Sequence, residues 1–378
     1  MKLARIARTG PDGVIPRLVA VQPEQQRVID LATAERLRLE RQGATQEAAR
    51  RLATALFPSS MAAAISLGEV FLAAARQAIE TAPEEAVMPL LQYPQTLQYP
   101  QTDRKKEEVE ASPPPAVQQG SVYQGKPQTS SGFAPGDLQW LSPLDPPLLR
   151  DFTAFEQHVQ NMSARQGQPI FKEFFQAPPY FKINPLTLIG HEQEVPWPNY
   201  TEYMDYELEI GLVIGKSGRN LSPQEALSHL FGVTILNDFS ARDIQGPEMS
   251  SGFGPSKGKD FATALGPWIT TCDEVDLTRL DMVARVNGEE WSRGSSATMT
   301  WKVEELIAYA SKGETIWPGE LLGSGTVGTG SGAEHGKQLH PGDVVELEVQ
   351  GIGVLRNRIG QPEPRGWEPE PRKSRISN

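Results

Sequence analysis

Two glutamates lie two positions apart in DYELEIGLVIGK, residues 205–216, a run that otherwise becomes fully apolar. Alternate side chains of a strand share a face, so Glu207 and Glu209 would point the same way, with Cα atoms about 7 Å apart. Buried carboxylates repel each other and resist leaving water, and a bound cation relieves both costs. The pattern therefore predicts a metal site, and an edge strand with a solvated acidic face is the alternative.

A further carboxylate follows the next apolar run. The segment GVTILNDFSARDIQ, residues 232–245, has the pattern of a strand that ends near Asp238. An aspartate at the end of a buried strand often lies at the mouth of a site, but it is also a common N-cap for a following helix. The sequence leaves both interpretations open.

An acid and an imidazole are spaced seven positions apart in RDFTAFEQHV, residues 150–159. We predict a helix over residues 151–163, which would bring Asp151 and His158 to one face, two turns apart. A histidine aligned with a substrate site is a candidate general base, and a surface histidine is the alternative. The other histidines that we assign, His191, His229 and His340, are predicted to be surface residues.

Two glycine-rich segments could bind an anionic group. In GFGPSKGKDFATALGPW, residues 252–268, Lys259 could reach such a group, although a surface loop with solvated lysines is the alternative. In GSGTVGTGSG, residues 323–332, backbone N–H groups could bind an oxyanion or a carboxylate. Neither segment has the spacing of a P-loop or of a dinucleotide fingerprint.

The elements that must position these residues fall into four stretches of the 378-residue chain. Residues 1–82 are predicted to form a small α/β domain, and residues 83–147 a Pro-rich linker or insertion that contains the duplication LQYPQTLQYPQT. Residues 148–360 are strand-rich with few helices, which favours a β-rich α+β fold with mixed sheets. Residues 361–378 are predicted to be a disordered tail.

Composition narrows the class of protein. The net charge of −11 argues against nucleic acid and anionic membrane surfaces as partners. The single cysteine, Cys272, allows no intrachain disulfide and fits a reducing cytosol. The N-terminus lacks the apolar run of a signal peptide, and residues 61–79 have the pattern of an amphipathic surface helix rather than a membrane span. We therefore expect a cytoplasmic protein.

Together these segments resemble the fumarylacetoacetate hydrolase family over residues 140–360, in order and with matching spacing. The segments that carry the resemblance are DFTAFEQH, DYELEIGLVIGK, NDFSARDIQ, GKDFATALGPW, GSGTVGTG and PGDVVELEVQGIGVLRNRI. Residues 1–82 are similar, more loosely, to the small N-terminal domain of the long bacterial members. The resemblance implies a catalytic domain built as a mixed β-roll.

The resemblance also implies a role for each matching residue. It implies a four-carboxylate metal site made by Asp151, Glu207, Glu209 and Asp238. It implies a base, His158, that is oriented by Glu334, and a catalytic Lys259. Substrate binding or oxyanion stabilisation would fall to Arg242, Gln245, Lys259, Thr263 and Thr326. Glu156 is a rival to Glu334, because shorter family members pair a nearby glutamate with the histidine.

An all-oxygen ligand set favours Mg²⁺, Ca²⁺ or Mn²⁺ over Zn²⁺. Four acids carry more charge than one divalent ion neutralises, so Arg242 and Lys259 would be needed close by. Seven helical residues span about 10.5 Å. On that geometry His158 lies too far along the helix to ligate the ion that Asp151 binds, and it would face a substrate held between them.

The resemblance implies a hydrolase acting on carbon–carbon bonds in ketonic substances. The expected partner is a 1,3-dicarbonyl (dioxo) acid such as fumarylacetoacetate or an acylpyruvate. His158 would draw a proton from water, the hydroxide would attack one carbonyl, and the carbanion would leave as an enolate stabilised by the metal and Lys259. Decarboxylation of an oxo-dicarboxylic acid, keto–enol isomerisation and binding without catalysis are the alternatives. Family members are usually homodimers, which implies a homodimer here.

Overall fold

The computed structural model describes residues 1–10, 13–90 and 139–372. The duplicated hexapeptide, most of the expected linker and the end of the expected tail lie outside these residues. Among the described residues, the strands form one large mixed sheet, one five-stranded sheet and two short pairs. The prediction of a β-rich α+β fold is confirmed.

The large sheet is twelve-stranded and runs in the order β4-β3-β2-β1-β15-β13-β11-β19-β6-β7, with β5 on β1 and β8 on β15. Its strands are β1 (Lys2–Gly10), β2 (Gly13–Gln22), β3 (Arg27–Asp30), β4 (Val87–Pro89), β5 (Gln139–Trp140), β6 (Leu149–Phe152), β7 (Tyr180–Ile183), β8 (Leu188–Ile189), β11 (Leu208–Ile214), β13 (Leu230–Asp238), β15 (Thr263–Thr271) and β19 (Leu321–Gly323). Every residue of β11, β13 and β15 except Phe231 is buried, which explains their nearly unbroken apolar sequence.

The other strands form smaller sheets. The five-stranded sheet has the order β17-β16-β20-β21-β9, with β9 (Glu194–Trp197), β16 (Asp281–Val286), β17 (Glu289–Ser295), β20 (Val344–Val349) and β21 (Gly353–Pro362). The two short pairs are β10 (Met204–Asp205) with β14 (Ser240–Ala241), and β12 (Gly218–Arg219) with β18 (Thr315–Ile316). Strand β21 passes the expected domain end at residue 360, because the Glu363 amide donates to the Trp197 carbonyl at 2.9 Å.

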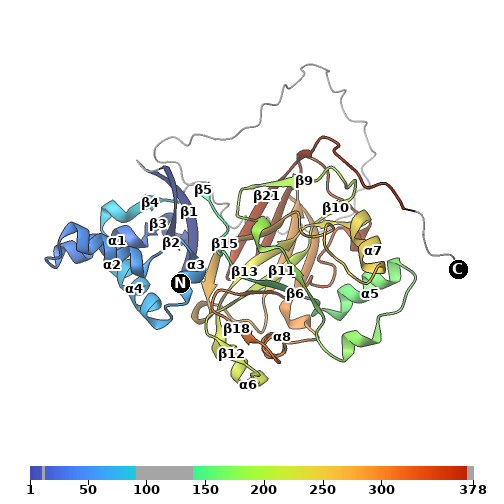
Figure 1. Ribbon diagram of the computed structural model, residues 1–378, viewed down its shortest axis with the longest axis horizontal. Coiled ribbons are helices and arrows are strands. Elements are labelled where there is room, and N and C mark those ends of the chain that lie inside the picture. The colour runs from blue at the N-terminus through green and yellow to red at the C-terminus, as the bar shows by residue number, and fades with distance from the viewer. Residues whose placement is uncertain (11–12, 91–138, 373–378) are drawn as a thin grey trace, which may run out of the picture.

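The helices are α1 (Leu31–Arg41), α2 (Gln46–Leu56), α3 (Met61–Ile65), α4 (Glu69–Glu80), α5 (Glu156–Arg165), α6 (Pro223–Ala226), α7 (Arg242–Ser250) and α8 (Val303–Ala310). The helix expected over residues 61–79 is in fact two helices, because Gly68 adopts a φ of 58° between α3 and α4. No helix among the described residues combines the length and the apolar character needed to cross a membrane. Helices α1 and α2 lie at one end of the molecule, and α5 and α7 lie at the other (Figure 1).

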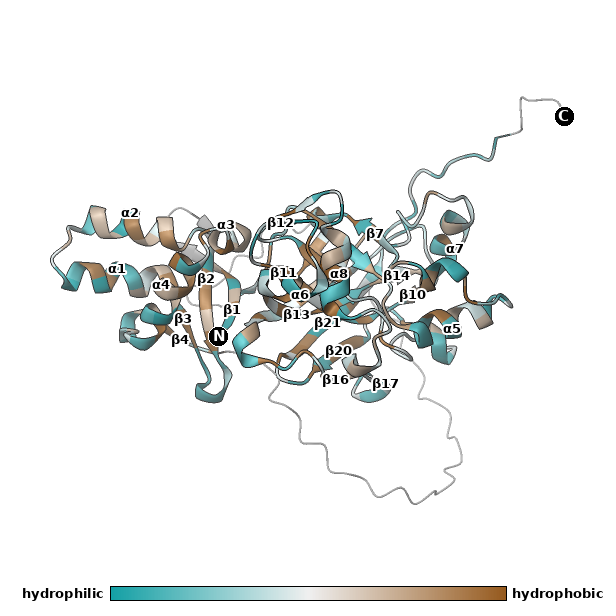
Figure 2. Ribbon diagram, turned by 90° about the horizontal axis from the view of Figure 1, so that it is seen from below, coloured by the Kyte–Doolittle hydropathy of each residue, from teal (hydrophilic) through white to brown (hydrophobic). Residues whose placement is uncertain are grey.

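The N-terminal strands continue the sheet of the strand-rich region. Lys2 and Leu3 of β1 pair with Thr270 and Ile269 of β15. The side chain of Phe71 on α4 stacks on Phe231 of β13, with ring centroids 6.3 Å apart. Brown apolar residues are frequent on the central strands, and teal polar residues are frequent on the outer helices and loops (Figure 2). The two parts therefore share one buried core, with Leu3, Leu18 and Phe71 in the same cluster as Leu265 and Ile269.

The helix predicted over residues 151–163 is wrong at its N-terminal end. Asp151 lies on β6, which pairs with β19 in parallel and with β7 in antiparallel orientation, and α5 begins only at Glu156. All four residues of β6 are buried, so two neighbouring strands determine its conformation more strongly than the helical spacing does. Asp151 and His158 therefore belong to different elements, and the helical distance between them does not apply.

Candidate active site

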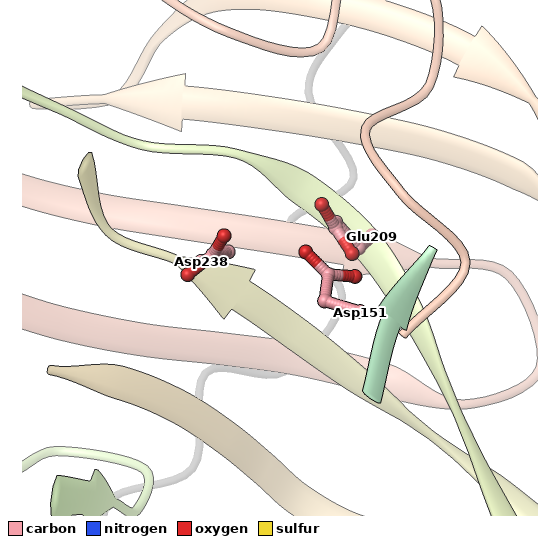
Figure 3. A group of neighbouring side chains, drawn as sticks. All are labelled: Asp151, Glu209 and Asp238. Atoms are coloured by element: carbon pink, nitrogen blue, oxygen red, sulfur yellow. The ribbon is translucent and has the colours of Figure 1, made fainter. Parts of the chain in front are cut away.

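Three of the predicted metal ligands come together in the large sheet. Asp151 on β6, Glu209 on β11 and Asp238 at the end of β13 each offer a carboxylate oxygen, and these oxygens lie within 4.8 Å of one another. Figure 3 shows Asp151 and Glu209 facing each other, with Asp238 beside them at the end of its strand. All three side chains are buried. The N-cap interpretation of Asp238 does not hold, because Ala241 occupies the N-cap position of α7.

Hydrogen bonds from the described residues do not satisfy all the carboxylate oxygens of this three-acid group. Burial raises the pKa of Asp151 to about 6. Burial, with the neighbouring carboxylates, raises the pKa values of Glu209 and Asp238 well above their ordinary range. Two buried oxygens, Asp151 Oδ1 and Asp238 Oδ1, have no hydrogen-bond partner among the described residues. A cation would satisfy both oxygens and remove the mutual repulsion, so this donor set fits a divalent ion with oxygen ligands.

The backbone leaves room for such an ion at Gly323. This residue pairs with Asp151 across β19 and β6. A Cβ atom at Gly323 would collide with Asp151 Oδ1 and would lie 3.1 Å from Glu209 Oε2. The absence of a side chain here therefore keeps the space between the two carboxylates open.

Glu207, predicted as the fourth metal ligand, lies outside the three-acid group. Its carboxylate accepts from Arg242 Nη2 at 2.8 Å and from Lys259 Nζ at 2.5 Å. Lys259 Nζ also bonds to Asp238. Burial alone would raise the pKa of Glu207, but the charges of Lys259 and Arg242 hold it well below its usual range. Glu207 is therefore an ionised acid that is paired with two cations at the edge of the acid group.

His158 and Glu334 form the predicted dyad. His158 Nδ1 lies 2.9 Å from Glu334 Oε2, and His158 Nε2 lies 3.6 Å from Glu207 Oε1. The Glu334 carboxylate also accepts from Asn161 Nδ2, the Thr329 amide, the Ser331 amide and the Ser331 hydroxyl. Although burial raises the pKa of Glu334, these bonds and His158 lower it below its usual range. The rival Glu156 is exposed and does not line the cavity.

A cavity of about 550 Å³ opens beside these groups. Predicted site residues in its wall are Asp151, His158, Glu207, Glu209, Arg242, Gln245, Lys259 and Thr326. Thr326 Oγ1 donates to Glu209 Oε1 at 3.2 Å, and Gln245 Oε1 accepts from Arg242 Nη1 at 2.9 Å. Thr263 does not line the cavity: it is buried on β15 opposite Asp238, so its predicted contact with substrate is not seen.

Sequence reasoning missed several residues that hold the site together. Asp205 is buried and accepts from Arg242, and its signal was present, because it continues the alternation of Glu207 and Glu209. Asn161 lies one turn after His158 and carried no signal beyond that spacing. Two expected surface histidines are also buried: His191 and His229 are 1% and 7% exposed. His191 accepts from the Arg356 amide, and burial lowers the pKa of His191 to about 3.

Comparisons with known proteins show the family of this chain. The family model described as Fumarylacetoacetate (FAA) hydrolase C-terminal matches residues 148–360. Over 186 residues the chain is 37% identical to oxaloacetate tautomerase YisK of Bacillus subtilis (strain 168), covering 48% of this chain and 61% of that protein. Over 178 residues it is 38% identical to 2,4-didehydro-3-deoxy-L-rhamnonate hydrolase of Sphingomonas sp. (strain SKA58), covering 46% of this chain and 62% of that protein. The matches thus span about three fifths of the length of these two relatives.

A solved structure extends the likeness to nearly the whole chain. The fumarylacetoacetate hydrolase from psychrophilic Exiguobacterium antarcticum superposes with a TM-score of 0.61 at 22% identity. The superposition covers 95% of this chain and 99% of that chain. At this identity the likeness shows the fold alone, including the N-terminal part that the family model does not reach.

Proposed function

Because this chain belongs to the fumarylacetoacetate hydrolase family, we propose that it is a metal-dependent hydrolase that cleaves a C–C bond in a 1,3-dicarbonyl acid. Fumarylacetoacetate and acylpyruvates are the expected substrates. The observation that carries the proposal is His158, which lines the same cavity as Asp151 and Glu209 and whose Nδ1 lies 2.9 Å from the Glu334 carboxylate behind it. A base oriented by a buried acid and an acid group fit for a divalent ion are the two parts that this hydrolysis needs.

His158 serves as the general base. The Glu334 carboxylate is an acceptor, so His158 Nδ1 donates in this hydrogen bond, and in the neutral imidazole Nε2 keeps its lone pair. Nε2 takes a proton from water, and the resulting hydroxide attacks the substrate carbonyl. A positioned base of this kind contributes roughly 10²- to 10⁴-fold to the rate. The imidazolium then returns its proton to the carbanion, so the net reaction consumes one water molecule.

Asp151, Glu209 and Asp238 would hold the divalent ion, with Mg²⁺, Ca²⁺ or Mn²⁺ favoured by their oxygen ligands. When bound, the ion supplies Lewis-acid polarisation of the dicarbonyl and stabilises the negative charge of the enolate. Lys259 Nζ bonds to Glu207 and Asp238 and has a third N–H to donate to a substrate oxygen. Lys259 and Arg242 thereby add positive charge where the leaving group becomes negative.

Steady-state turnover tests this proposal directly. The expected result is Mg²⁺-dependent hydrolysis of fumarylacetoacetate or an acylpyruvate, lost by at least about 10²-fold in His158→Ala. The matched control is His340→Ala, because the side chain of His340 is exposed and lies outside the cavity wall. The proposal would be wrong if His158→Ala were as active as the control. It would also be wrong if the turnover rate were the same with added Mg²⁺ and with chelator.

Decarboxylation or keto–enol isomerisation of an oxo-dicarboxylic acid is the second candidate. It is favoured by the 37% identity to a protein named as an oxaloacetate tautomerase. The same base could move a proton on carbon without activating water. Product analysis with oxaloacetate and with acylpyruvates separates the reactions, since only hydrolysis yields two carboxylic acids. A third candidate, binding without catalysis, would be favoured if calorimetry detected no binding of a divalent ion.

We further propose a cytoplasmic homodimer, with no nucleic-acid or membrane partner. The net charge of −11 supports the absence of these partners, and the lone Cys272 supports the cytoplasmic location. The homodimer is proposed from family membership alone. Burial raises the pKa of the Cys272 thiol to about 11, which keeps it unreactive. Sedimentation analysis at micromolar concentration would test the dimer, and a single species of 41.5 kDa would exclude it.

A further inference from the structure

We infer that Asp205 is a positioning residue. Its buried carboxylate binds both Arg242, which in turn binds Glu207, and the backbone of the turn that contains Glu334. This inference rests on the proposed function, because it concerns how the base His158 and the cation Arg242 are held at a fixed distance in the same cavity. Asp205 is fully buried on β10 and does not line the cavity, so it acts through its neighbours rather than on the substrate.

Five N–H groups converge on this carboxylate. Asp205 Oδ2 accepts from Arg242 Nε at 2.9 Å, from Arg242 Nη2 at 2.7 Å and from the Ala333 amide at 3.1 Å. Asp205 Oδ1 accepts from the Gly332 amide at 2.9 Å and from the Tyr206 amide at 3.0 Å. Burial raises the pKa of Asp205, but the charge of Arg242 and the bonds from Arg242 and the Ala333 amide oppose this rise. The five bonds hold each donor in place.

The first pair of donors fixes the cationic side of the cavity. Arg242 Nη2 bonds to Asp205 and also, at 2.8 Å, to Glu207 Oε1. The same Glu207 oxygen faces His158 Nε2 at 3.6 Å. Without the Asp205 charge, the guanidinium would have Glu207 as its only acid partner among the described residues and would shift toward it.

The backbone donors fix the base. The amides of Gly332 and Ala333 begin the short 3₁₀ turn Ala333–His335, which includes Glu334. Glu334 reaches from this turn to His158 Nδ1. The turn packs closely against Asp205, since a Cβ atom at Gly332 would lie 2.7 Å from Asp205 Oδ1. Asp205 thus sets the distance between the turn that orients the base and the arginine that faces the substrate.

Displacement of a catalytic group by about 1 Å can cost on the order of 10²-fold in rate. We therefore expect Asp205→Asn to lower kcat/KM by roughly 10- to 100-fold, with kcat reduced through Glu334 and KM raised through Arg242. The chain offers a matched control in Asp30. Asp30 is also fully buried, accepts from Arg17 Nε and Nη2 at 3.0 and 2.9 Å, and caps a helix through the Thr33 amide at 3.0 Å, but it lies on β3, in the N-terminal part of the large sheet.

The experiment compares Asp205→Asn with Asp30→Asn in the full chain. Both variants remove the charge from a buried Asp–Arg pair, so a purely structural role predicts similar losses of thermal stability and similar kinetics. We expect the Asp30 variant to keep kcat/KM within about twofold. In double-mutant cycles, Asp205→Asn should be coupled at least about threefold to Arg242→Met and to Glu334→Gln. Additive effects in both cycles, or matching kinetics of the two asparagine variants, would overturn the inference.

A readout independent of turnover separates this inference from the proposed function. The proton between His158 Nδ1 and Glu334 gives a downfield ¹H NMR resonance, which Asp205→Asn should shift or broaden and Asp30→Asn should not. If Asp205→Asn fails to fold, Gly332→Ala replaces it. Gly332 has an ordinary helical φ of −62°, and an added Cβ would press most closely on Asp205 Oδ1, at 2.7 Å, and less closely on the Lys337 carbonyl, at 3.1 Å. An unchanged resonance in the folded variant would contradict the inference. A wild type without turnover would contradict the proposed function alone.

Discussion

At the scale of single residues, the site depends on two kinds of buried carboxylate, one with a lowered pKa and one with raised pKa values. Glu334 has five hydrogen-bond donors around it and stays ionised beside His158. Asp151, Glu209 and Asp238 have their pKa values raised by burial, and two of their oxygens have no described partner. The first arrangement orients a base, and the second is suited to an ion.

Glu334→Gln tests the first arrangement. A glutamine amide can donate to His158 Nδ1 and thereby favour the tautomer whose Nε2 carries the proton. We expect kcat to fall by about 10²- to 10⁴-fold with little change in KM. Steady-state kinetics of the single variant and of the double variant with His158→Ala provide the measurement. The double variant should be no slower than His158→Ala alone, and a further multiplicative loss would contradict the dyad.

The pH dependence of stability in metal-free protein tests the second arrangement. The pKa of Asp151 is raised from an unfolded value near 3.8 to about 6. A carboxyl with a raised folded pKa stabilises the fold fully below its unfolded pKa, and this contribution is lost as the pH rises through the folded pKa. The magnitude for Asp151 is on the order of 3 kcal/mol. We therefore expect the Tm of chelator-treated protein to fall as the pH rises from about 4 to about 6.

Added Mg²⁺ should restore the lost stability at the upper end of this pH range, since it replaces protons as the counter-charge. Calorimetric melting with and without Mg²⁺ is the measurement. A Tm that is flat with pH and insensitive to Mg²⁺ at neutral pH would show that the acid group is already satisfied without an ion.

At the scale of elements, the sequence predicted the long buried strands correctly but predicted a helix where the short strand β6 lies. The runs around Glu209 and Asp238 read correctly as strands because they are continuously apolar and buried on both faces. Asp151 was misread because helical spacing is a local signal, whereas β6 exists through its neighbours β19 and β7. The pairing of Glu334 with His158, 176 residues away, came from the family resemblance and not from local pattern.

The strand pair β6–β19 supplies a test at this scale. Gly323→Ala would place a Cβ against Asp151 Oδ1 and Glu209 Oε2, in the space assigned to the ion. We expect metal affinity to fall by at least about tenfold, with secondary structure preserved, and isothermal titration calorimetry measures it. The control is Gly246→Ala, where an added Cβ meets nothing within 4 Å. Equal affinity in both variants would place the ion elsewhere.

At the scale of the whole molecule, the sequence predicted a small N-terminal domain, and the structure joins that part to the large sheet. The prediction rested on a composition change near residue 83, which cannot reveal that β1 pairs with β15. Pairing between residues about 270 positions apart leaves no local pattern, so continuity of the sheet had to come from the structure. The site lies toward the other end of this sheet, on β6, β11 and β13.

Phe71→Ala tests whether the two parts unfold together. Phe71 is fully buried on α4 and contacts both Phe57 and Phe231. Truncation should cost about 3–5 kcal/mol of the free energy of unfolding. Because Phe231 belongs to β13, we expect a single cooperative transition at lower temperature, followed by circular dichroism and by loss of metal binding. Two separated transitions, with the site stable after the N-terminal part melts, would contradict the shared core.

The central claim is that His158 activates water against a carbonyl of a dioxo acid. Mass spectrometry of the products formed from an acylpyruvate in H₂¹⁸O tests it most directly. We expect pyruvate and a second carboxylic acid that carries one ¹⁸O atom from solvent, formed only when Mg²⁺ is present. A product that is only tautomerised or decarboxylated, with no solvent oxygen in a new carboxylate, would contradict it.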